Sequence, residues 1–156
     1  MTAFSSSDDS IASVDANGLV AHNCAEQPLP AYGCCCLGSI DLTRFVRAPF
    51  DDAAAFDHAA FAEVCKVAVR MLDNVLDVSV WPLPQQLAEA RSKRRVGLGF
   101  TGLGDALVML GLRYDTKEAR EKATAISETM RDAAYDASVE LAHLGTDIAF
   151  RFPCHL

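Results

Sequence analysis

The sequence predicts an α/β chain that is mostly helical and contains one or two short strands. Apolar residues recur at three- and four-residue spacing across 61–76 and again across 119–141, which is typical of one buried helix face. A short apolar run interrupted by glycines, 96–100, favours a strand between those helices. With 156 residues, 51% hydrophobic and 22% charged, the chain has the size of one ordinary domain. It is also too apolar to be disordered throughout.

The first third of the chain predicts little regular structure. Residues 1–20 are rich in Ser and Asp and lack a sustained period, so we expect a loop or a disordered lead-in. Residues 21–50 carry prolines and glycines between short apolar runs, which favours a loop with one strand near 37–42. A long helix follows, which Asp57 is placed to cap and which the prolines within 81–84 end. Its predicted buried face consists of Phe61, Val64, Cys65, Ala68, Leu72, Val75 and Leu76.

Three short elements are predicted next. Residues 85–94 indicate a polar helix, 96–100 a strand, and 102–110 a short helix that Gly111 is placed to stop. A lone strand cannot satisfy the hydrogen-bonding groups along its edges. The predicted strands therefore require partners that this chain does not obviously contain.

The last helix has the clearest signals. Asp115 and Glu118 form an Asp variant of the capping box at its start, and Gly145 suits its end. One apolar seam runs along it, consisting of Ala119, Ala123, Ile126, Met130, Ala133, Ala137 and Leu141.

Charge and composition disfavour two classes of partner. Lys and Arg number 14 and Asp and Glu 21, a formal net charge of −7, whereas DNA and RNA binding depends on neutralising phosphates. The one basic run, 91–95, is expected to cover solvated surface. No apolar run approaches the roughly 18–20 residues that span a bilayer, and the first residues do not resemble a secretory signal. We therefore expect a cytoplasmic protein with no nucleic-acid or membrane partner.

Six cysteines suggest metal or redox chemistry, because thiols in a cytoplasmic protein are reduced. They are Cys24, Cys34, Cys35, Cys36, Cys65 and Cys154. A metal site could use His22 and Cys24 with the three-cysteine run, but adjacent side chains diverge and the usual ligand spacing is missing, so we expect no metal. Small buried residues in a packed loop explain Cys36 and Cys65 equally well.

Cys24-Ala25-Glu26 is the pattern most typical of chemistry. In extended backbone, residues two apart lie on one face, so the thiol and the carboxylate could address the same substrate. This suits a redox or radical sulfur beside a general base. His22 shares that face, which leaves a His-activated thiol of the papain kind as an alternative.

The segment 97–102 matches the pattern GxGxxG of dinucleotide-binding folds. That fingerprint needs a buried strand before the glycines and a full crossover helix after them. Here polar residues precede the glycines, and the distance from Gly102 to Asp115 is too short. Close backbone packing at a strand-to-helix turn explains the glycines better.

Several segments in order resemble the ribonucleotide reductases. Residues 24–30 (CAEQPLP) and 32–42 (YGCCCLGSIDL) are similar to the active-site segment of that family, closest to its adenosylcobalamin-dependent (class II) branch. Later segments of the same enzymes resemble 70–77, 93–107, 131–135 and 138–142, so the likeness covers roughly 22–143. The pattern departs before the first cysteine, where the family usually has Asn two residues upstream of it and this chain has His22 and Asn23.

The resemblance implies a fold and a reaction. The family fold is a ten-stranded α/β barrel with a finger loop inside, of which this chain would be a mostly helical fragment. Cys24 matches the cysteine that becomes a thiyl radical and takes the ribose 3′-hydrogen, and Glu26 matches the carboxylate that handles the 3′-hydroxyl proton. Cys35 matches one of the two cysteines that reduce the substrate and end as a disulfide, and its partner is absent from this chain. The implied substrate-binding residues are His22, Asn23, Cys24, Ala25 and Glu26.

The implied cofactor is adenosylcobalamin (vitamin B12), with binding residues not identifiable in this chain. The implied partners are a ribonucleotide, a thioredoxin-type or dithiol reductant, and the remainder of the reductase chain. We expect a lead-in over 1–21, barrel over 22–143 and a divergent tail over 144–156, with the chain inactive alone. Two alternatives remain, a helical interaction module that docks on an intact reductase and a small thiol or metal-binding protein.

Overall fold

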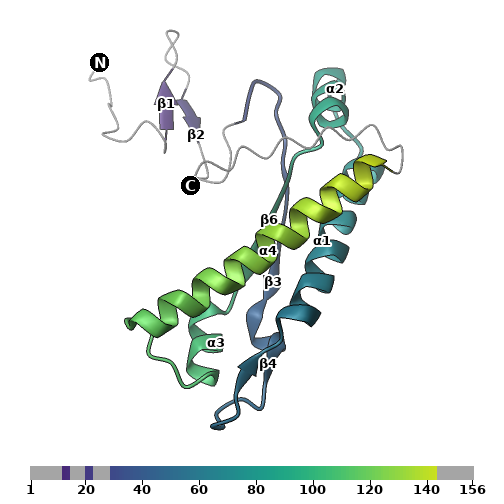
Figure 1. Cartoon of the computed structure of the whole chain (residues 1–156). Coiled ribbons are helices and arrows are strands. Elements are labelled where there is room, and N and C mark those ends of the chain that lie inside the picture. The colour runs from purple at the N-terminus through teal and green to yellow at the C-terminus, as the bar shows by residue number, and fades with distance from the viewer. Residues whose placement is uncertain (1–11, 15–19, 23–28, 144–156) are drawn as a thin grey trace, which may run out of the picture.

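Two parallel strands, β3 (Cys36–Asp41) and β6 (Val96–Thr101), form the centre of the fold. They are paired in register over their whole length, from Cys36 opposite Val96 to Asp41 opposite Thr101. Figure 1 shows the computed structural model, which describes residues 12–14, 20–22 and 29–143. A parallel pair needs a long crossover connection, and here the crossover contains two helices.

Helices α1 (His58–Val78) and α4 (Lys117–His143) lie side by side and cover one face of this strand pair. The two helices share a core in which Phe61 and Cys65 of α1 meet Ile126 and Met130 of α4. A second cluster joins Val69 of α1 to a set of α4 residues, Ala134, Ala137 and Leu141. The core therefore lies between the helix layer and one side of the β3–β6 pair.

Shorter elements complete the described residues. Three of them follow β3, namely the 3-10 helix η1 (Leu42–Phe45) and the strands β4 (Val46–Arg47) and β5 (Ala55–Phe56). Strands β4 and β5 pair antiparallel with each other. Helix α2 (Pro84–Lys93) precedes β6, and α3 (Leu103–Met109) follows it and packs against η1. Near the N-terminus, β1 (Ala12–Val14) pairs antiparallel with β2 (Val20–His22).

The described residues contain six strands, so the expectation of one or two was wrong in number. The two expected strands are the long ones, β3 and β6, and the other four have only two or three residues each. Strands β1 and β2 fall where the sequence predicts loop or disorder. Their signal is the dipeptide Asn17-Gly18 between two short apolar runs, which is typical of a hairpin.

Helix α1 begins as predicted and ends earlier. The side chain of Asp57 accepts a hydrogen bond from the backbone N–H of Ala60 and caps the helix. The helix ends at Val78, before Trp81, because the Ser79 hydroxyl donates to the carbonyl of Val75 at 2.6 Å and the Ser79 N–H donates to the same carbonyl. A serine that satisfies the last turn in this way competes with helix continuation.

The buried face of α1 differs from the predicted one at several positions. Val64 and Val75 are exposed and Ala68 is half-buried, whereas Val69 and Asp73 are buried instead. The helix packs mainly against α4, β3 and β6. The outer part of its wide apolar stripe is exposed among the described residues.

Helix α4 keeps its predicted seam but not its predicted cap. Every residue of the seam is buried except Ala123, which is half-buried. The cap is Thr116, whose hydroxyl accepts a hydrogen bond from the N–H of Ala119 at 3.2 Å. Asp115 pairs instead with the guanidinium of Arg113. Gly145, the predicted stop, lies outside the described residues.

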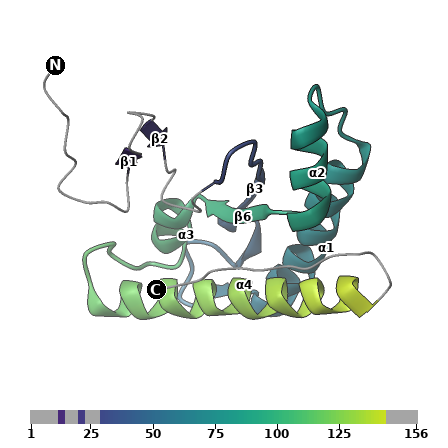
Figure 2. The same cartoon turned by 90° about the horizontal axis from the view of Figure 1, so that it is seen from above.

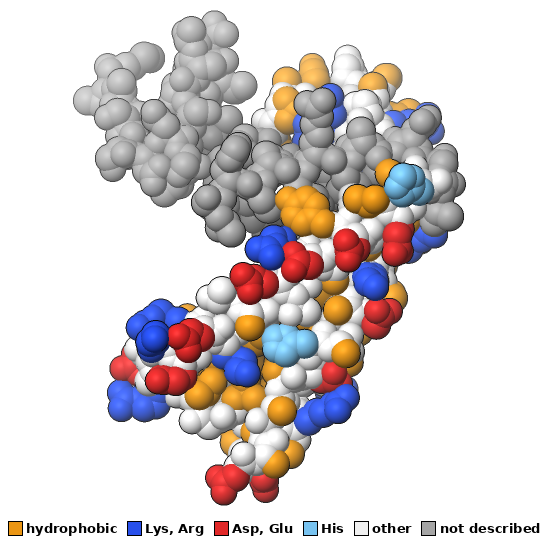
Figure 3. Space-filling model, in the orientation of Figure 1, with side chains coloured by type: hydrophobic (Ala, Val, Ile, Leu, Met, Phe, Trp, Pro, Cys, Tyr) orange, Lys and Arg blue, Asp and Glu red, His pale blue; other side chains and the backbone are white. Residues whose placement is uncertain are grey.

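Charged side chains of both signs gather along the outer side of α4 (Figure 3). This matches an amphipathic helix with one face in the core and one in water. Among the described helices, none is long and apolar enough to cross a membrane.

Candidate active site

The β3–β6 pair has one covered face and one open face. On the covered face, Ile40 and Val96 are buried, and a Cβ added to Gly38 would lie 3.2 Å from Cδ2 of Leu72 in α1. Side chains alternate along a strand, so the intervening positions point the other way. They are Leu37, Ser39 and Asp41 of β3, which are exposed, opposite Gly97, Gly99 and Thr101 of β6. We refer to these six residues as the open face.

The cysteines of the three-cysteine run do not share one environment. Cys36 belongs to the covered face, where it packs against the cluster of Leu72, Leu76 and Val96. Cys34, Cys35 and Cys36 are all half-buried. Burial raises the pKa of Cys36, and it also raises the pKa of Cys34 although the charge of Arg95 partly opposes it. Both thiols are therefore protonated at neutral pH, which fits packed residues rather than nucleophiles.

Cys65 is a packed thiol, as expected. It is fully buried in the core between α1 and α4, and burial raises its pKa to about 11. A thiol with that pKa carries almost no thiolate near neutral pH. Cys65 thus contributes to the core as a small apolar residue.

Arg95 connects the thiol segment to helix α2. Its guanidinium donates to Oε1 of Glu89 at 2.7 Å, and both side chains are largely buried. Its backbone carbonyl accepts a hydrogen bond from the N–H of Cys36 at 3.0 Å. The start of β3 is therefore held by the residue directly before β6.

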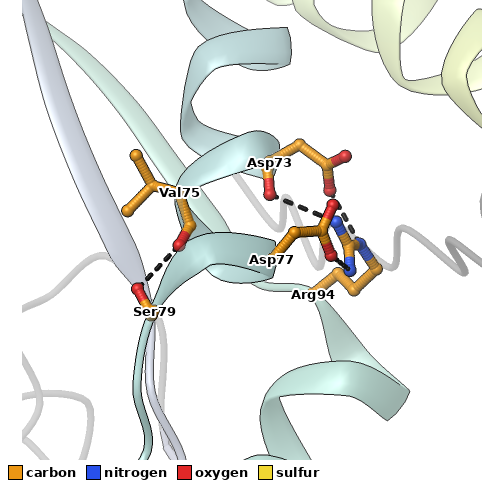
Figure 4. Close-up of polar contacts among 5 residues, drawn as sticks. All are labelled: Asp73, Val75, Asp77, Ser79 and Arg94. Atoms are coloured by element: carbon orange, nitrogen blue, oxygen red, sulfur yellow. Dashed lines mark hydrogen bonds and ion pairs between the residues drawn. The ribbon is translucent and has the colours of Figure 1, made fainter.

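Arg94 is buried between two carboxylates of α1 (Figure 4). Its Nε donates to Oδ1 of Asp73 at 2.8 Å, its Nη1 to Oδ1 of Asp77 at 2.6 Å, and its Nη2 to the carbonyl of Asp73 at 3.1 Å. The hydrogen bonds to Asp77 and Asp73 raise the pKa of Arg94, and the guanidinium lowers the pKa of Asp77.

The prediction that the basic run 91–95 covers solvated surface was wrong for its last two residues. Arg94 is only 7% exposed, and the side chain of Arg95 is largely buried. A signal was present in the sequence, because Asp73 and Asp77 stand four apart, each directly after a leucine of the apolar stripe. Two carboxylates on one helix face need cationic partners when that face is buried.

The turn after β6 explains one glycine of the 97–102 segment. Gly102 has φ +72°, and an added Cβ would lie 2.8 Å from Oδ1 of Asp41. That carboxylate caps η1 by accepting from the N–H and the hydroxyl of Thr43 at 3.0 and 2.7 Å. These hydrogen bonds lower the pKa of Asp41. Close packing at this strand-to-helix turn, as the sequence indicated, accounts for Gly102.

Most of the predicted site residues lie outside the described residues. These are Asn23, Cys24, Ala25 and Glu26. His22 is the last residue of β2, where its backbone pairs with Ala12. Cys35 is the one predicted catalytic-segment residue whose surroundings are described, directly before β3.

Within 29–143 and the two short N-terminal strands, no three His, Cys, Asp or Glu side chains come together to hold a metal. A polar hollow of about 580 Å³ lies between α1 and α2, where Asp77, Arg91 and Arg94 contribute to its walls. An apolar cavity of about 180 Å³ lies between β6 and α4, beside Phe100 and Met130.

The chain belongs to the ribonucleotide reductase barrel family. The family model for the ribonucleotide reductase barrel domain matches residues 18–151, a range that runs past residue 143. A vitamin B12-dependent ribonucleoside-diphosphate reductase of Mycobacterium tuberculosis is 43% identical over 119 residues, which cover 76% of this chain and 16% of the relative.

Two further relatives show how wide this likeness is. The vitamin B12-dependent ribonucleoside-diphosphate reductase of Thermoplasma acidophilum is 35% identical over 119 residues, which cover 76% of this chain and 15% of the relative. A ribonucleoside-diphosphate reductase large subunit of Trypanosoma brucei brucei is 40% identical over 108 residues, 69% of this chain and 12% of the relative. The chain thus spans 16% or less of the length of these curated relatives.

Proposed function

We propose that this chain supplies the thiol-bearing part of a ribonucleotide reductase barrel and serves the reduction of ribonucleotides to deoxyribonucleotides. The observation that carries the proposal is the match of the barrel-domain family to residues 18–151. The β3–β6 pair supports it, because among the described residues it has an open face and no further strand at its outer edges, which suits two neighbouring strands of a larger barrel. The partners are the nucleotide substrate and the remainder of the reductase.

The proposed reaction uses Cys24, Glu26 and Cys35. A thiyl radical at Cys24 takes the hydrogen from C3′ of the ribose, and Glu26 accepts the proton of the 3′-hydroxyl. The 2′-hydroxyl leaves as water. Cys35 and a partner thiol outside the described residues give two electrons and two protons, one of which leaves in the water, and form a disulfide. Glu26 returns its proton to the 3′-oxygen, and the hydrogen returns from Cys24 to C3′. Overall, a ribonucleotide and a dithiol become a deoxyribonucleotide, a disulfide and water.

Strand alternation supports Cys35 over its neighbours as the reducing thiol. Cys36 packs on the covered face, and alternation extended one residue back from β3 assigns Cys35 to the open side with Leu37 and Ser39. The raised pKa of Cys34 and of Cys36 fits packing roles for both. The substrate would then approach the open face. The proposed binding residues, which precede β3 in the sequence, are His22, Asn23, Cys24, Ala25 and Glu26.

We assign the chain to the B12-dependent branch on its likeness to two reductases that bear that name. Adenosylcobalamin, when bound, supplies the radical from which a thiyl can be generated. The described residues bring together no site suited to such a large cofactor, so its contacts are expected in the rest of the enzyme. A thioredoxin-type or small dithiol reductant would then reduce the disulfide, in the cytoplasm.

A chimera tests the proposal. The aligned segment of the M. tuberculosis relative is replaced by the matching segment of this chain, and deoxyribonucleotide formation is measured with adenosylcobalamin and a dithiol. We expect turnover by the chimera and a loss of at least about a hundredfold in Cys24→Ser and Cys35→Ser. The matched control, Cys34→Ser, should retain most of the activity. Equal losses in Cys34→Ser and Cys35→Ser would contradict the assignment of Cys35.

The purified 156-residue chain is expected to form no deoxyribonucleotide alone.

A second candidate function is that of a helical module docking on an intact reductase, and the observation that favours it is the second apolar face of α1. That face consists of Val64, Val67, Met71, Val75 and Val78, all exposed. Co-purification of the chain with a full-length reductase, lost when Val67 is changed to Lys, would support docking.

A further inference from the structure

Two energetically unfavourable features coincide at Arg94. Its backbone is left-handed, with φ 42° and ψ 52°, a conformation that side chains other than glycine rarely adopt. Its charged group is also buried, and removal of a charge from water is unfavourable even when it is paired. A buried ion pair is weak evidence for a stabilising role, and its best-attested use is to fix the registry of packed elements.

The guanidinium fixes the end of α2 to α1 in one orientation. Three hydrogen bonds reach three different acceptors, two carboxylate oxygens and the carbonyl of Asp73 (Figure 4). Asp73 is 1% exposed, so this anchor lies inside the protein. The N–H of Arg94 donates to the carbonyl of Ala90 and ends α2. A planar fork bound at several points allows little sliding or rotation.

From this anchor the connection to the thiols is short. The next residue, Arg95, accepts the N–H of Cys36 through its carbonyl, and Val96 then forms the first pair of the parallel ladder with Cys36. Helix α1 also packs on β3, where Leu72 contacts Gly38. Helix α1 therefore holds both strands, β3 by packing and β6 through Arg94.

The side chains of β6 do not by themselves fix its register. A slip of two residues along β3 would keep Val96, Leu98 and Phe100 on the covered face, because the side-chain period of a strand is two. Gly97 and Gly99 contribute no side chain that would resist the slip. Such a slip displaces the strands by about 6–7 Å, given a rise of about 3.3 Å per residue.

We propose that Arg94 is a positioning residue that pins the register of β6 against β3 and thereby fixes where the Cys35 thiol lies on the open side of the pair. The importance of that placement for catalysis rests on the proposed function of Cys35. The effect of Arg94 on the β3–β6 register is a property of the chain and can be observed without substrate.

The test uses the full 156-residue chain with Arg94→Met and, as the charge-conserving variant, Arg94→Lys. In the native register Leu37 lies opposite Gly97. We expect NMR contacts between these two residues to weaken at least twofold in Arg94→Met, with new contacts from Leu37 to Arg95 or Gly99. Amide exchange at Cys36 should quicken at least tenfold beyond any change in the global unfolding constant measured by urea. Arg94→Lys should show intermediate effects.

Two controls separate pinning from general destabilisation. Ile126→Val weakens a buried site of α4 and should quicken exchange throughout, with the Leu37–Gly97 contacts retained. Arg113→Met removes an exposed ion pair with Asp115 and should change neither readout. If Arg94→Met does not fold, the same measurements are made on Asp73→Asn, which keeps the side-chain shape and removes the charge. Undiminished Leu37–Gly97 contacts in a folded variant would contradict the proposed role of Arg94.

Alkylation rates test whether Arg94 affects the placement of the Cys35 thiol. The rate of iodoacetamide reaction at Cys35 relative to Cys34, read by peptide mass spectrometry, should change at least threefold in Arg94→Met and not in Ile126→Val. An unchanged ratio together with altered strand contacts overturns the effect on Cys35. Failure of the proposed function is distinguishable, because it would appear as an inactive chimera while these substrate-free readouts still respond.

Discussion

Two glycines only two residues apart, Gly102 and Gly104, differ in backbone conformation and in the space available for a Cβ atom. Gly102 has a positive φ, and an added Cβ would lie 2.8 Å from Oδ1 of Asp41, whereas an added Cβ at Gly104 meets nothing within 4 Å. We therefore expect Gly102→Ala to lower the free energy of unfolding by about 1–3 kcal/mol. Gly104→Ala, inside helix α3, should raise it by up to about 1 kcal/mol. Urea unfolding of both variants checks the contrast, and equal effects would contradict it.

His58 connects the start of α1 to α4 and should make stability depend on pH. The Thr129 hydroxyl donates its proton to the carbonyl of Ala125, so Nδ1 of His58 donates to Thr129 at 2.7 Å. Burial lowers the pKa of His58, the charge of Lys122 lowers it further, and the Asp57 carboxylate opposes them. The folded protein therefore takes up the proton less readily than the unfolded chain.

The sign of the effect follows from that difference. The unfolded histidine has a pKa of about 6.5, so below that pH the unfolded state binds more protons and the free energy of unfolding falls. The contribution of His58 is present above about pH 6.5 and is lost as the pH falls toward the folded-state pKa. We expect the fall in stability between pH 7.5 and 5.5 to be smaller in His58→Gln than in the wild type. Equal falls in urea titrations would show that another group dominates.

At the scale of the elements, the first turn of α4 offers a direct comparison of two caps. Thr116 accepts the N–H of Ala119, while Asp115 is exposed and pairs with Arg113. Thr116→Ala should therefore lower the free energy of unfolding by about 1 kcal/mol. Asp115→Ala should change it by less than about 0.5 kcal/mol. Thermal or urea unfolding of the two variants measures the difference. A larger loss of unfolding free energy in Asp115→Ala would contradict Thr116 as the cap and support the predicted Asp115 cap.

The elements that the sequence predicted well are those with local signals. Helix α1 has a capping aspartate and an apolar period, β6 is a short apolar run, and Gly111 has the positive φ expected of a helix stop. The errors about burial involve contacts distant in sequence. The burial of Arg94 depends on Asp73 and Asp77 from another helix, and the exposure of Val64 depends on which side of α1 meets α4. Periodicity gives the faces of an element but not which neighbour covers each face.

The candidate site divides in the same way. The resemblance supplied Cys24, Glu26 and Cys35 from the order of residues alone, and the first two lie outside the described residues. The packing of Cys36 on the covered face could be recognised only with the strand pair, because a covered face is defined only once α1 packs on β3. No local pattern indicated that Arg95 holds the start of that strand.

At the scale of the whole molecule, the described residues leave two surfaces without a neighbour. One is the open face of β3 and β6, together with the outer edges of the pair. The other is the second apolar face of α1, formed by Val64, Val67, Met71, Val75 and Val78. Exposed apolar faces and strand edges of this kind are typical of interfaces, and in an isolated chain they favour association.

Two valines that stand two apart on α1 separate association from stability. Val67 is 68% exposed and Val69 is fully buried against α4. We expect Val67→Lys to reduce self-association of the purified chain and to change its free energy of unfolding by less than about 0.5 kcal/mol, because the ammonium stays in water. Val69→Lys buries an unpaired charge and should lower the free energy of unfolding by more than about 3 kcal/mol, to the point of unfolding. Sedimentation velocity measures association and circular dichroism measures folding. If Val67→Lys associates as strongly as the wild type while remaining folded, the α1 face is not the contact, and the open strand pair becomes the surface through which copies of the chain meet.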